Sequence, residues 1–567
     1  MGRSLEVIKI RGFHSARVSG RPRWVARRAS LSGIVRAMRR WQRYWFRAGG
    51  PISSAILRIA IATSILWMLW RLRDGYAGSP DTSPHGLYRP IGILRLVPGE
   101  PSPMAFSVVW AVAWAATVAM LLGLRSRTST AVSFVAALVI ASYEYSFAAS
   151  WSHDNNAPLL AQLAFLGARG GDAWSIDAWW RRRRGDAAPA GHAYAWSVLL
   201  VQLAIGLMMA SAAYTKLASG GTSLAWVCSD NLRNHILVRF DLAGLPRTAI
   251  ADWLVDSPVR WKVTAALNIV AQLAPLAACF ATRRPVLRAL LGSMFVIETF
   301  ALDAVMGFSN YHWLPLGVVF VDWDWLAARL QRRAPEPDRV VSVRRIVRGF
   351  VAAFVLCDLV IAFYRWPKLD QRLGAYPLSA FPMFGSIRAR PPYGEHQLYE
   401  ILEGRIEVVS DPRPEPAVQS WIDHHPAGHD LLGARTADEA RATLTAFSRE
   451  LQTVFPNLAI RTLRAQLVSI QAQPYPAPAR LDRVDVATIA ELSRHGSFRC
   501  MLGQVDADRA FAAPVGLPAS DRLASYRDGG FTDLVVGGAG LARKTYVVVR
   551  VVVPGEGERT FVVGARS

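Results

Sequence analysis

The sequence predicts an α-helical membrane bundle of about nine transmembrane helices, followed by a C-terminal soluble α+β domain. Three observations predict this fold class. Hydrophobic residues make up 52% of the 567 residues, charged residues only 19%, and the mean hydropathy is +0.20. The apolar residues gather in long blocks, as a bilayer requires of helices about 20 residues long. From Arg365 onwards these blocks give way to alternating apolar and polar residues. Disorder is excluded, because a disordered chain has low hydrophobicity.

Three regions follow one another along the chain. Residues 1–47 hold 13 Arg or Lys and one Glu. No short apolar stretch with a small-residue cleavage site follows them, so we expect a basic cytoplasmic tail. Residues 48–364 form the predicted transmembrane domain. Its nine apolar segments, of which the fourth is the shortest, are 52–70, 104–124, 129–149, 157–170, 194–216, 262–282, 286–308, 311–329 and 346–364.

The positions of the arginines predict the orientation in the membrane. With the N-terminus inside, every predicted inner loop is basic, including the run Arg181 to Arg184 and the loop 330–345. The outer loop 71–103 carries four arginines and disagrees. The positive-inside rule therefore favours a cell-membrane protein with a cytoplasmic N-terminus and an outer C-terminus. The same rule accounts for the net charge of +23, so nucleic acid is not expected as a partner.

Two further stretches carry local signals. In the outer loop 217–261, helical apolar spacing over Leu224–Val238 and Thr248–Leu254 predicts short helices on the outer membrane surface. Residues 365–567 form the predicted extracytoplasmic domain. The strands expected there are Leu398–Val409, Thr545–Val553 and Thr560–Val563, and a helix is expected from the N-cap Thr436 to Leu451.

Several kinds of site are not indicated. The four cysteines are scattered and form no C-x-x-C pair. His424, His425 and His429 have a metal-like spacing, but Pro426 interrupts the helix that such a site needs. Nucleotide-binding loops and the elbow of serine hydrolases are absent from the sequence.

Lys216 is the most informative candidate for chemistry. It stands at the outer end of the fifth segment, and it is one of only five lysines in a chain that otherwise uses arginine. A lysine in hydrocarbon is costly unless it finds a partner or extends to the interface. Unlike arginine, lysine can lose its proton and act as a general base. The residue is therefore either a base or an anchor at the membrane surface.

Polar residues of other outer loops stand at the same side of the membrane. His153 lies between the third and fourth segments, beside Asn155 and Asn156, and this group either orients an anion or caps a helix. His312 lies at the outer end of the eighth segment. Within the segments, ionisable residues are usually functional or paired. The carboxylates there are Glu144, Glu298 and Asp303, and Arg58 is the expected ionic partner of one of them.

The order of several short motifs resembles a known group. These motifs are Ala55-Ile56-Leu57-Arg58-Ile59, Gly86-Leu87-Tyr88-Arg89-Pro90, His153 to Asn156, Trp174-Ser175-Ile176-Asp177 and Tyr214-x-Lys216-Leu217. Over about half of the chain, from Trp45 to about Trp325, this layout resembles the HTTM domain of the vitamin K-dependent gamma-carboxylase-like family. Later, Tyr376 to Phe384 is similar to C-terminal extensions of bacterial relatives. Two departures are Thr215, where a second lysine is expected, and Gly220-Gly221 in place of a tryptophan that here comes at Trp226.

The resemblance implies nine spans and a function. Members of the family use a lysine to deprotonate a vitamin K quinol, which leads to an epoxide and to carboxylation of glutamate. Lys216 matches that lysine, and His153 matches a histidine near the quinone. The resemblance thus implies a quinol as cofactor and an exported protein as substrate. The expected quinol contacts are Asn155, Asn156 and Tyr214, together with His312, which the predicted topology places at the same side of the membrane.

Two alternatives remain open. In one, the chain is a non-catalytic membrane scaffold or lipid-binding module with an exported domain, and Lys216 and His153 share no pocket. In the other it is a transporter whose path is lined by Glu144, Glu298 and Asp303. The repeat symmetry and paired broken helices that many transporters show are absent from the sequence.

Overall fold

The fold is described here from a computed structural model of the full chain. The residues that it describes are 38–75, 77, 88, 90–146, 153–186, 192–220, 224–241, 245–332, 340–363, 383–384, 400–423, 425, 427, 431, 437–472, 475–500, 522–524, 532–535, 545–553 and 557–566. All structural statements below concern these residues.

The chain is mostly helical, and six of the described helices are long and apolar enough to cross a membrane. They are α2 (Pro51–Leu72), α3 (Pro103–Leu122), α7 (Ala195–Gly220), α11 (Pro258–Phe280), α12 (Pro285–Met306) and α14 (Arg345–Phe363). Large apolar side chains on their outer faces are exposed, for example Val270 at 63% and Leu356 at 64%. Such faces are stable in hydrocarbon and unfavourable in water. The helices therefore define a membrane protein.

The other three predicted segments are not among these six helices. The third is a 20-residue helix, α4 (Ser126–Tyr145). The fourth is only the nine-residue helix α5 (Asn156–Ala164), because Gly167, at a φ of 75°, turns the chain away soon after the helix ends. The eighth is the 3-10 helix η6 (Tyr311–Phe320) with Pro315 inside it, and a separate helix, α13 (Trp323–Leu330), follows. Proline cannot donate the backbone bond that a longer α-helix needs.

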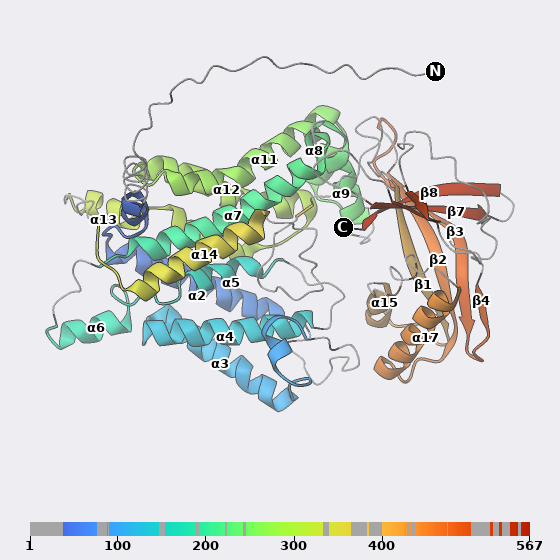
Figure 1. The fold of residues 1–567 in the computed structure, drawn as a ribbon, viewed down its shortest axis with the longest axis horizontal. Helices are drawn as coiled ribbons and strands as arrows, with labels where there is room; N and C mark the ends of the chain where they lie inside the picture. Colours follow the sequence, from blue (N-terminus) through green and yellow to red (C-terminus); the bar gives the residue numbers. More distant parts are fainter. Residues whose placement is uncertain are drawn as a thin grey trace, which may run out of the picture.

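Helix α7 is the central element of the bundle, with helices on several sides (Figure 1). Most residues of its apolar stretch are buried inside the protein. Polar side chains join neighbouring helices, as they commonly do in membranes. Gln202 of α7 donates to the carbonyl of Val319 at 2.6 Å, and Gln162 of α5 donates to Ser133 of α4 at 2.8 Å.

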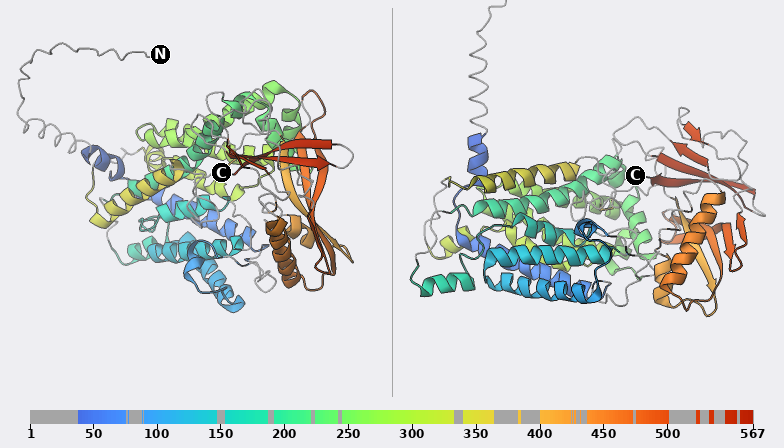
Figure 2. Two further views of the ribbon diagram at one scale, coloured as in Figure 1. Left: turned by 45° about the vertical axis from the view of Figure 1, so that its right-hand side comes forward. Right: turned by 60° about the horizontal axis from the view of Figure 1, so that its bottom comes forward.

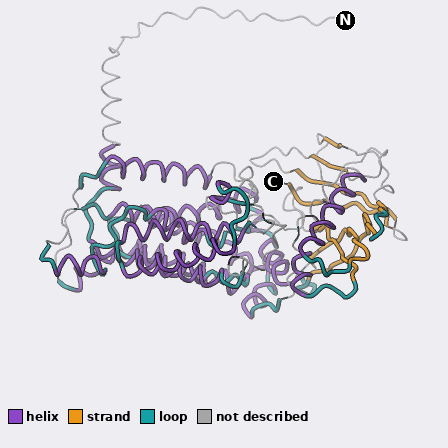
Figure 3. Tube along the Cα trace, turned by 90° about the horizontal axis from the view of Figure 1, so that it is seen from below, coloured by secondary structure: helices purple, strands orange, loops and turns teal. Residues whose placement is uncertain are grey.

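The two ends of the bundle differ. One end carries α6 (Ile176–Arg183) and α13, and there Asp324 accepts hydrogen bonds from the backbone N–H groups of Ile52 and Ser53 at the start of α2. The other end carries α8 (Ala225–Cys228), α9 (Asn231–Asp241) and α10 (Ala249–Val255), which pack against α11 and α12. The strands lie beyond this second end in every view (Figures 1, 2 and 3).

The C-terminal part contains two antiparallel sheets. In the first, the order is β1-β2-β3-β4, and α15 (Pro416–Asp423) and α17 (Ala437–Val454) pack against it through a core that includes Leu444, Phe447 and Leu463. In the second, the order is β5-β6-β7-β8. The strands are β1 (Glu400–Ser410), β2 (Ile460–Ala472), β3 (Leu481–Ser493), β4 (Phe498–Cys500), β5 (Arg522–Ala524), β6 (Thr532–Val535), β7 (Thr545–Val553) and β8 (Gly557–Arg566).

The local predictions for this part correspond to observed elements. The strand predicted at Leu398–Val409 is β1, and the one at Thr545–Val553 is β7 with the same bounds. The third predicted strand lies inside β8, which pairs antiparallel with β7. The predicted helix is α17, while its expected N-cap, Thr436, lies outside the described residues.

Candidate functional site

The amine of Lys216 is enclosed between three membrane helices. The residue lies near the end of α7 and is 2% exposed. Its Nζ donates to Oδ1 of Asn268 at 2.6 Å and to Oε1 of Gln272 at 3.1 Å. Asn268 and Gln272 are four residues apart on α11, so both side chains reach the same face of that helix. The amine is therefore hydrogen-bonded to two amide oxygens inside the bundle.

The same two amides connect Lys216 to a carboxylate on a third helix. Asn268 and Gln272 donate through their nitrogens to Oε1 of Glu298 on α12, at 2.5 and 2.8 Å. Glu298 is 3% exposed. Each amide thus presents its oxygen to the amine and its nitrogen to the carboxylate, which is the orientation that an ammonium and a carboxylate would impose. We call Lys216, Asn268, Gln272 and Glu298 the lysine cluster.

An aromatic side chain covers the amine. Nζ of Lys216 lies 4.6 Å from the ring centroid of Trp226 on α8, within the range of a cation–π contact. The indole of Trp226 donates to the backbone carbonyl of Phe384 at 2.8 Å. The Phe384 ring in turn packs against Phe308 and His235. A residue that follows the last membrane helix therefore holds the cover of the lysine cluster in place.

A second polar cluster joins α2, α4, η6 and the start of α5. The backbone carbonyl of Asp154 accepts from the indole of Trp313 at 2.6 Å and from Nε2 of His312 at 2.8 Å. Nδ1 of His312 lies 2.8 Å from a guanidinium nitrogen of Arg71. Because arginine can only donate, Nδ1 accepts, and His312 is neutral with its proton on Nε2. The carboxylate of Asp154 lies 3.7 Å from Arg71 and accepts from the hydroxyl of Tyr145.

Three residues that the sequence singled out around position 153 lie in this second cluster or beside it in the chain. Asn155 donates to the hydroxyl of Tyr145 at 2.8 Å. Asn156 is fully buried, and neither polar atom of its amide has a partner among the described residues. Burial lowers the pKa of His153 to about 4, although the nearby Asp154 acts in the opposite direction. His153 is therefore neutral at physiological pH.

The structure groups the predicted site residues in three places. His312, Asn155 and Asn156 belong to the second cluster or its helix, and His153 directly precedes Asp154. Lys216 belongs to the lysine cluster. Tyr214 is 42% exposed, and its ring packs against Phe363 of α14. The contacts of the described residues thus do not bring Tyr214 or His153 to the amine of Lys216.

The carboxylates of the membrane helices have other partners than Arg58. Glu144 accepts from the backbone N–H of Ala77 at 2.8 Å, and Asp303 accepts from the hydroxyl of Tyr311 at 2.6 Å. Arg58, which is fully buried, donates instead to the carbonyls of Leu121, Gly170 and Trp174. The prediction that Arg58 pairs with an intramembrane carboxylate is therefore wrong. The physical reason is that the end of α3 and the loop before α6 leave carbonyls without helical partners. A guanidinium can bond several of these carbonyls.

Sequence reasoning missed Asn268, Gln272 and the role of Arg71. The two amides are uncharged and stand in an apolar helix, so neither charge nor composition distinguishes them. Their spacing of four residues is the signal that could have found them. Arg71 was the first residue of an outer loop that disagreed with the positive-inside rule, and its pairing with Asp154 and His312 explains why it is tolerated there.

The histidines of the C-terminal part do not form a metal site in the described residues. Nε2 of His425 lies 3.3 Å from Glu450 and its ring packs on Trp421, while His424 and His429 lie outside the described residues. No group of three or more metal-ligating side chains occurs among the residues that were placed.

Comparisons of the chain with protein-family models, curated proteins and solved structures found no match. The class of protein therefore follows from the fold alone. Six described helices with the length and composition of membrane spans, enclosing a lysine and a glutamate, define an integral membrane protein with a polar centre.

Proposed function

We propose that the chain is a membrane enzyme in which Lys216 removes a proton from a lipid-soluble quinol, in the manner of the carboxylases that its sequence resembles. The observation that carries the proposal is the enclosed lysine cluster. An amine that is 2% exposed and a carboxylate that is 3% exposed are joined by two shared amides. Membrane proteins rarely retain such groups without a function or a partner.

The cluster can form a free amine without a change in its net charge, and it gains one positive charge when that amine accepts a substrate proton. One proton can be held as an ammonium beside a carboxylate, or as an amine beside a carboxylic acid. In the second arrangement Nζ of Lys216 carries a lone pair that can accept a proton from a substrate hydroxyl. The amide nitrogens of Asn268 and Gln272 can bond Glu298 in both arrangements.

The donors of the second cluster and of the chain beside it also have chemistry that suits a quinol. Asn156 offers both a donor and an acceptor that have no partner among the described residues, and buried amides normally have partners. His153 is neutral, and the ring of neutral His312 packs against the indole of Trp313. At the lysine cluster, Trp226 would cover the amine and Lys216 would receive the proton of a ring hydroxyl. A bound quinol would supply the acidic hydroxyl and the reducing electrons.

We further propose that nine segments cross the membrane, with the C-terminal part outside. Three of these, α4, α5 and η6, would cross as inner or irregular elements. An odd number of crossings is supported by the fold, because residues 38–45 and the sheets lie at opposite ends of the bundle (Figure 1). The basic helix α6 lies at the end where residues 38–45 are, as the positive-inside rule requires of a cytoplasmic side.

Substitution of Lys216 tests the enzymatic proposal. The full chain would be placed in lipid nanodiscs, supplied with a reduced naphthoquinone and oxygen, and followed by the loss of quinol and the gain of epoxide. Lys216→Ala is expected to abolish turnover while the protein stays inserted. Lys262→Ala on α11 is the matched control, because it removes a lysine that is not part of the lysine cluster. Equal turnover by wild type and Lys216→Ala would eliminate the proposal.

The non-catalytic alternative makes a different prediction for the same preparation. A scaffold or lipid-binding module would show no quinol turnover in the wild type either, and bound quinone would be absent from a lipid extract of the purified protein. Mass spectrometry of that extract therefore distinguishes an inactive preparation of a quinol enzyme from a protein that binds no quinone.

A further inference from the structure

A basic cavity lies at the end of the bundle that carries α6. It has a volume of about 320 Å³ and is lined by the start of α4, by the chain after α5 and by α6 itself. The charged residues around it are four arginines and two aspartates: Arg125, Arg127, Arg169, Arg181, Asp172 and Asp177. The cavity is far from the lysine cluster in the fold, since Lys216 lies near the opposite end of α7.

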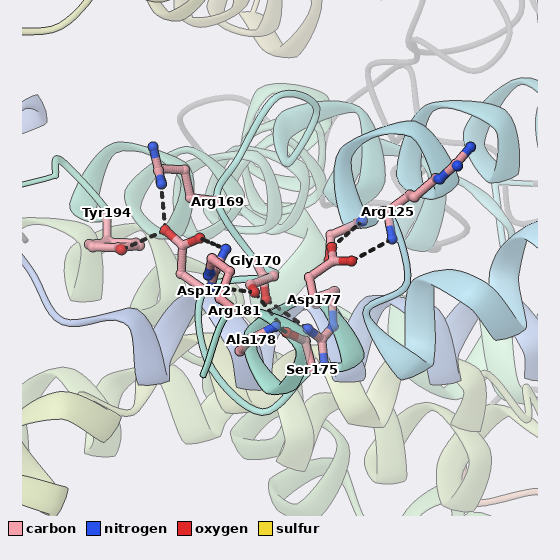
Figure 4. A network of polar contacts seen from close by, with 12 residues as sticks. Arg125, Arg169, Gly170, Asp172, Ser175, Asp177, Ala178, Arg181 and Tyr194 are labelled. Atoms are coloured by element: carbon pink, nitrogen blue, oxygen red, sulfur yellow. Dashed lines mark hydrogen bonds and ion pairs between the residues drawn. The ribbon is translucent and has the colours of Figure 1, made fainter. Parts of the chain in front are cut away.

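Both aspartates form hydrogen bonds with residues that line the cavity or lie beside it (Figure 4). Asp172 is bonded by Arg169 at 2.6 Å, by Arg181 at 3.1 Å and by the hydroxyl of Tyr194 at 2.7 Å. Asp177 accepts from the backbone N–H groups of Arg125 and Ser126 at 2.8 and 2.9 Å. No carboxylate of the described residues pairs with the guanidinium groups of Arg125 and Arg127. The cavity therefore retains an excess of positive charge.

A second observation points to a ligand in this cavity. The hydroxyl of Ser126, in the first turn of α4, is buried and has no hydrogen-bond partner among the described residues, and the residue is 6% exposed. A Cβ added to Gly171 would come within 2.4 Å of that hydroxyl. The backbone is thus held close to a hydroxyl that bonds nothing in the protein. A hydroxyl beside guanidinium groups forms the chemistry that binds a phosphate.

The adjoining helix indicates where that phosphate comes from. Trp179 and Trp180 of α6 are exposed, at 42% and 43%, and the guanidinium of Arg183 stacks on Trp179 at 3.9 Å from the ring centroid. Exposed tryptophan beside arginine is typical of a segment at the level of the lipid headgroups. We propose that the cavity binds the phosphate of an anionic phospholipid from the adjacent leaflet, with Arg127 and Ser126 as its principal contacts.

Lipid binding by defined variants tests this proposal. The full-length protein would be purified in detergent, and its binding of phosphatidylglycerol and of phosphatidylcholine would be measured by native mass spectrometry. Arg127→Glu is expected to weaken phosphatidylglycerol binding by about tenfold, because it replaces a charge-assisted contact by a repulsive one. Arg182→Glu is the matched control, since this exposed arginine of α6 makes the same charge change outside the cavity.

Ser126→Ala separates binding from folding. Its hydroxyl has no partner in the protein, so its removal is expected to leave the thermal unfolding midpoint unchanged while it weakens phosphatidylglycerol binding about threefold. Equal binding of phosphatidylglycerol by wild type, Arg127→Glu and Ser126→Ala would overturn the proposal. In a separate arm, inorganic phosphate would be added in excess. Binding of inorganic phosphate with no preference for phosphatidylglycerol would assign the cavity to a soluble phosphate and would overturn the lipid source.

Discussion

Lys216 and Glu298 are joined by two parallel amide bridges, one through Asn268 and one through Gln272. This arrangement ties α7 to α12 across α11 at a place where hydrocarbon offers no other polar partner. Removal of one member of a buried charge pair leaves the other uncompensated, at a cost of about 3–5 kcal/mol. The bridged pair therefore contributes to stability as well as to the proposed chemistry.

The pair is expected to behave as one unit in a double-mutant cycle. Lys216→Met and Glu298→Gln should each destabilise the protein, and the double variant should cost less than the sum of the two by about 1–3 kcal/mol. The free energy of unfolding in mixed micelles, measured by denaturant titration, provides the comparison. Strict additivity of the two substitutions would show that the amides do not couple the two charges.

Arg58 is expected to be irreplaceable by lysine. Its guanidinium bonds the carbonyls of Leu121 at the end of α3 and of Gly170 and Trp174 in the connection between α5 and α6. An ammonium at the end of a lysine cannot reproduce this planar fork. Arg58→Lys should therefore destabilise the protein by about 3 kcal/mol, since hydrogen bonds to charged groups contribute about 1.5–3 kcal/mol each. Arg184→Lys, at an exposed position of the same end, should change the thermal unfolding midpoint very little.

The acid stability of the end near α6 should depend on Asp172. Burial by itself would raise the pKa of Asp172, but the hydrogen bonds from Arg169 and Tyr194, with the charges of Arg169 and Arg181, lower it below the usual value. The resulting stabilisation is complete above the unfolded pKa, which is about 4, and it is lost as the pH falls through the lower folded pKa. The difference in unfolding midpoint between wild type and Asp172→Asn should therefore shrink below about pH 4.

Tyr194→Phe refines this test, because it removes one donor to Asp172 and keeps the ring. The stabilisation that Asp172 provides should then be lost at a higher pH than in the wild type. A transition that stays at the same pH in Tyr194→Phe would show that the tyrosine does not influence the pKa of Asp172.

Trp226 is expected to control access to the amine of Lys216. Trp226→Phe keeps an aromatic cover and loses the hydrogen bond to Phe384, at a cost of about 1 kcal/mol, whereas Trp226→Ala should cost about 3–5 kcal/mol and open the cluster. The rate at which a membrane-soluble, amine-reactive reagent labels Lys216 should rise from the wild type to Trp226→Phe and again to Trp226→Ala. Equal labelling of all three proteins would contradict the role of the indole as a cover.

The sequence was informative where the signal is local. Apolar runs predicted the positions of the six long helices, and alternation predicted β1 and β7. Lys216 was identified because a single amine in an apolar segment is unusual wherever its neighbours lie. Asn268 and Gln272 could not be assigned to it, since their contact depends on how α7 and α11 pack. The partner of Arg58 was predicted wrongly for the same reason. A sequence shows charges, whereas the unpaired carbonyls at a helix end and in a nearby loop are visible only in the fold.

The bond between Trp226 and Phe384 has a consequence for how the two halves of the molecule can influence each other. The backbone carbonyl of Phe384 accepts from the indole that covers Lys216, so a shift of Phe384 would shift that indole as well. The exposure of the amine can therefore depend on the position of a residue that lies far from it in the sequence.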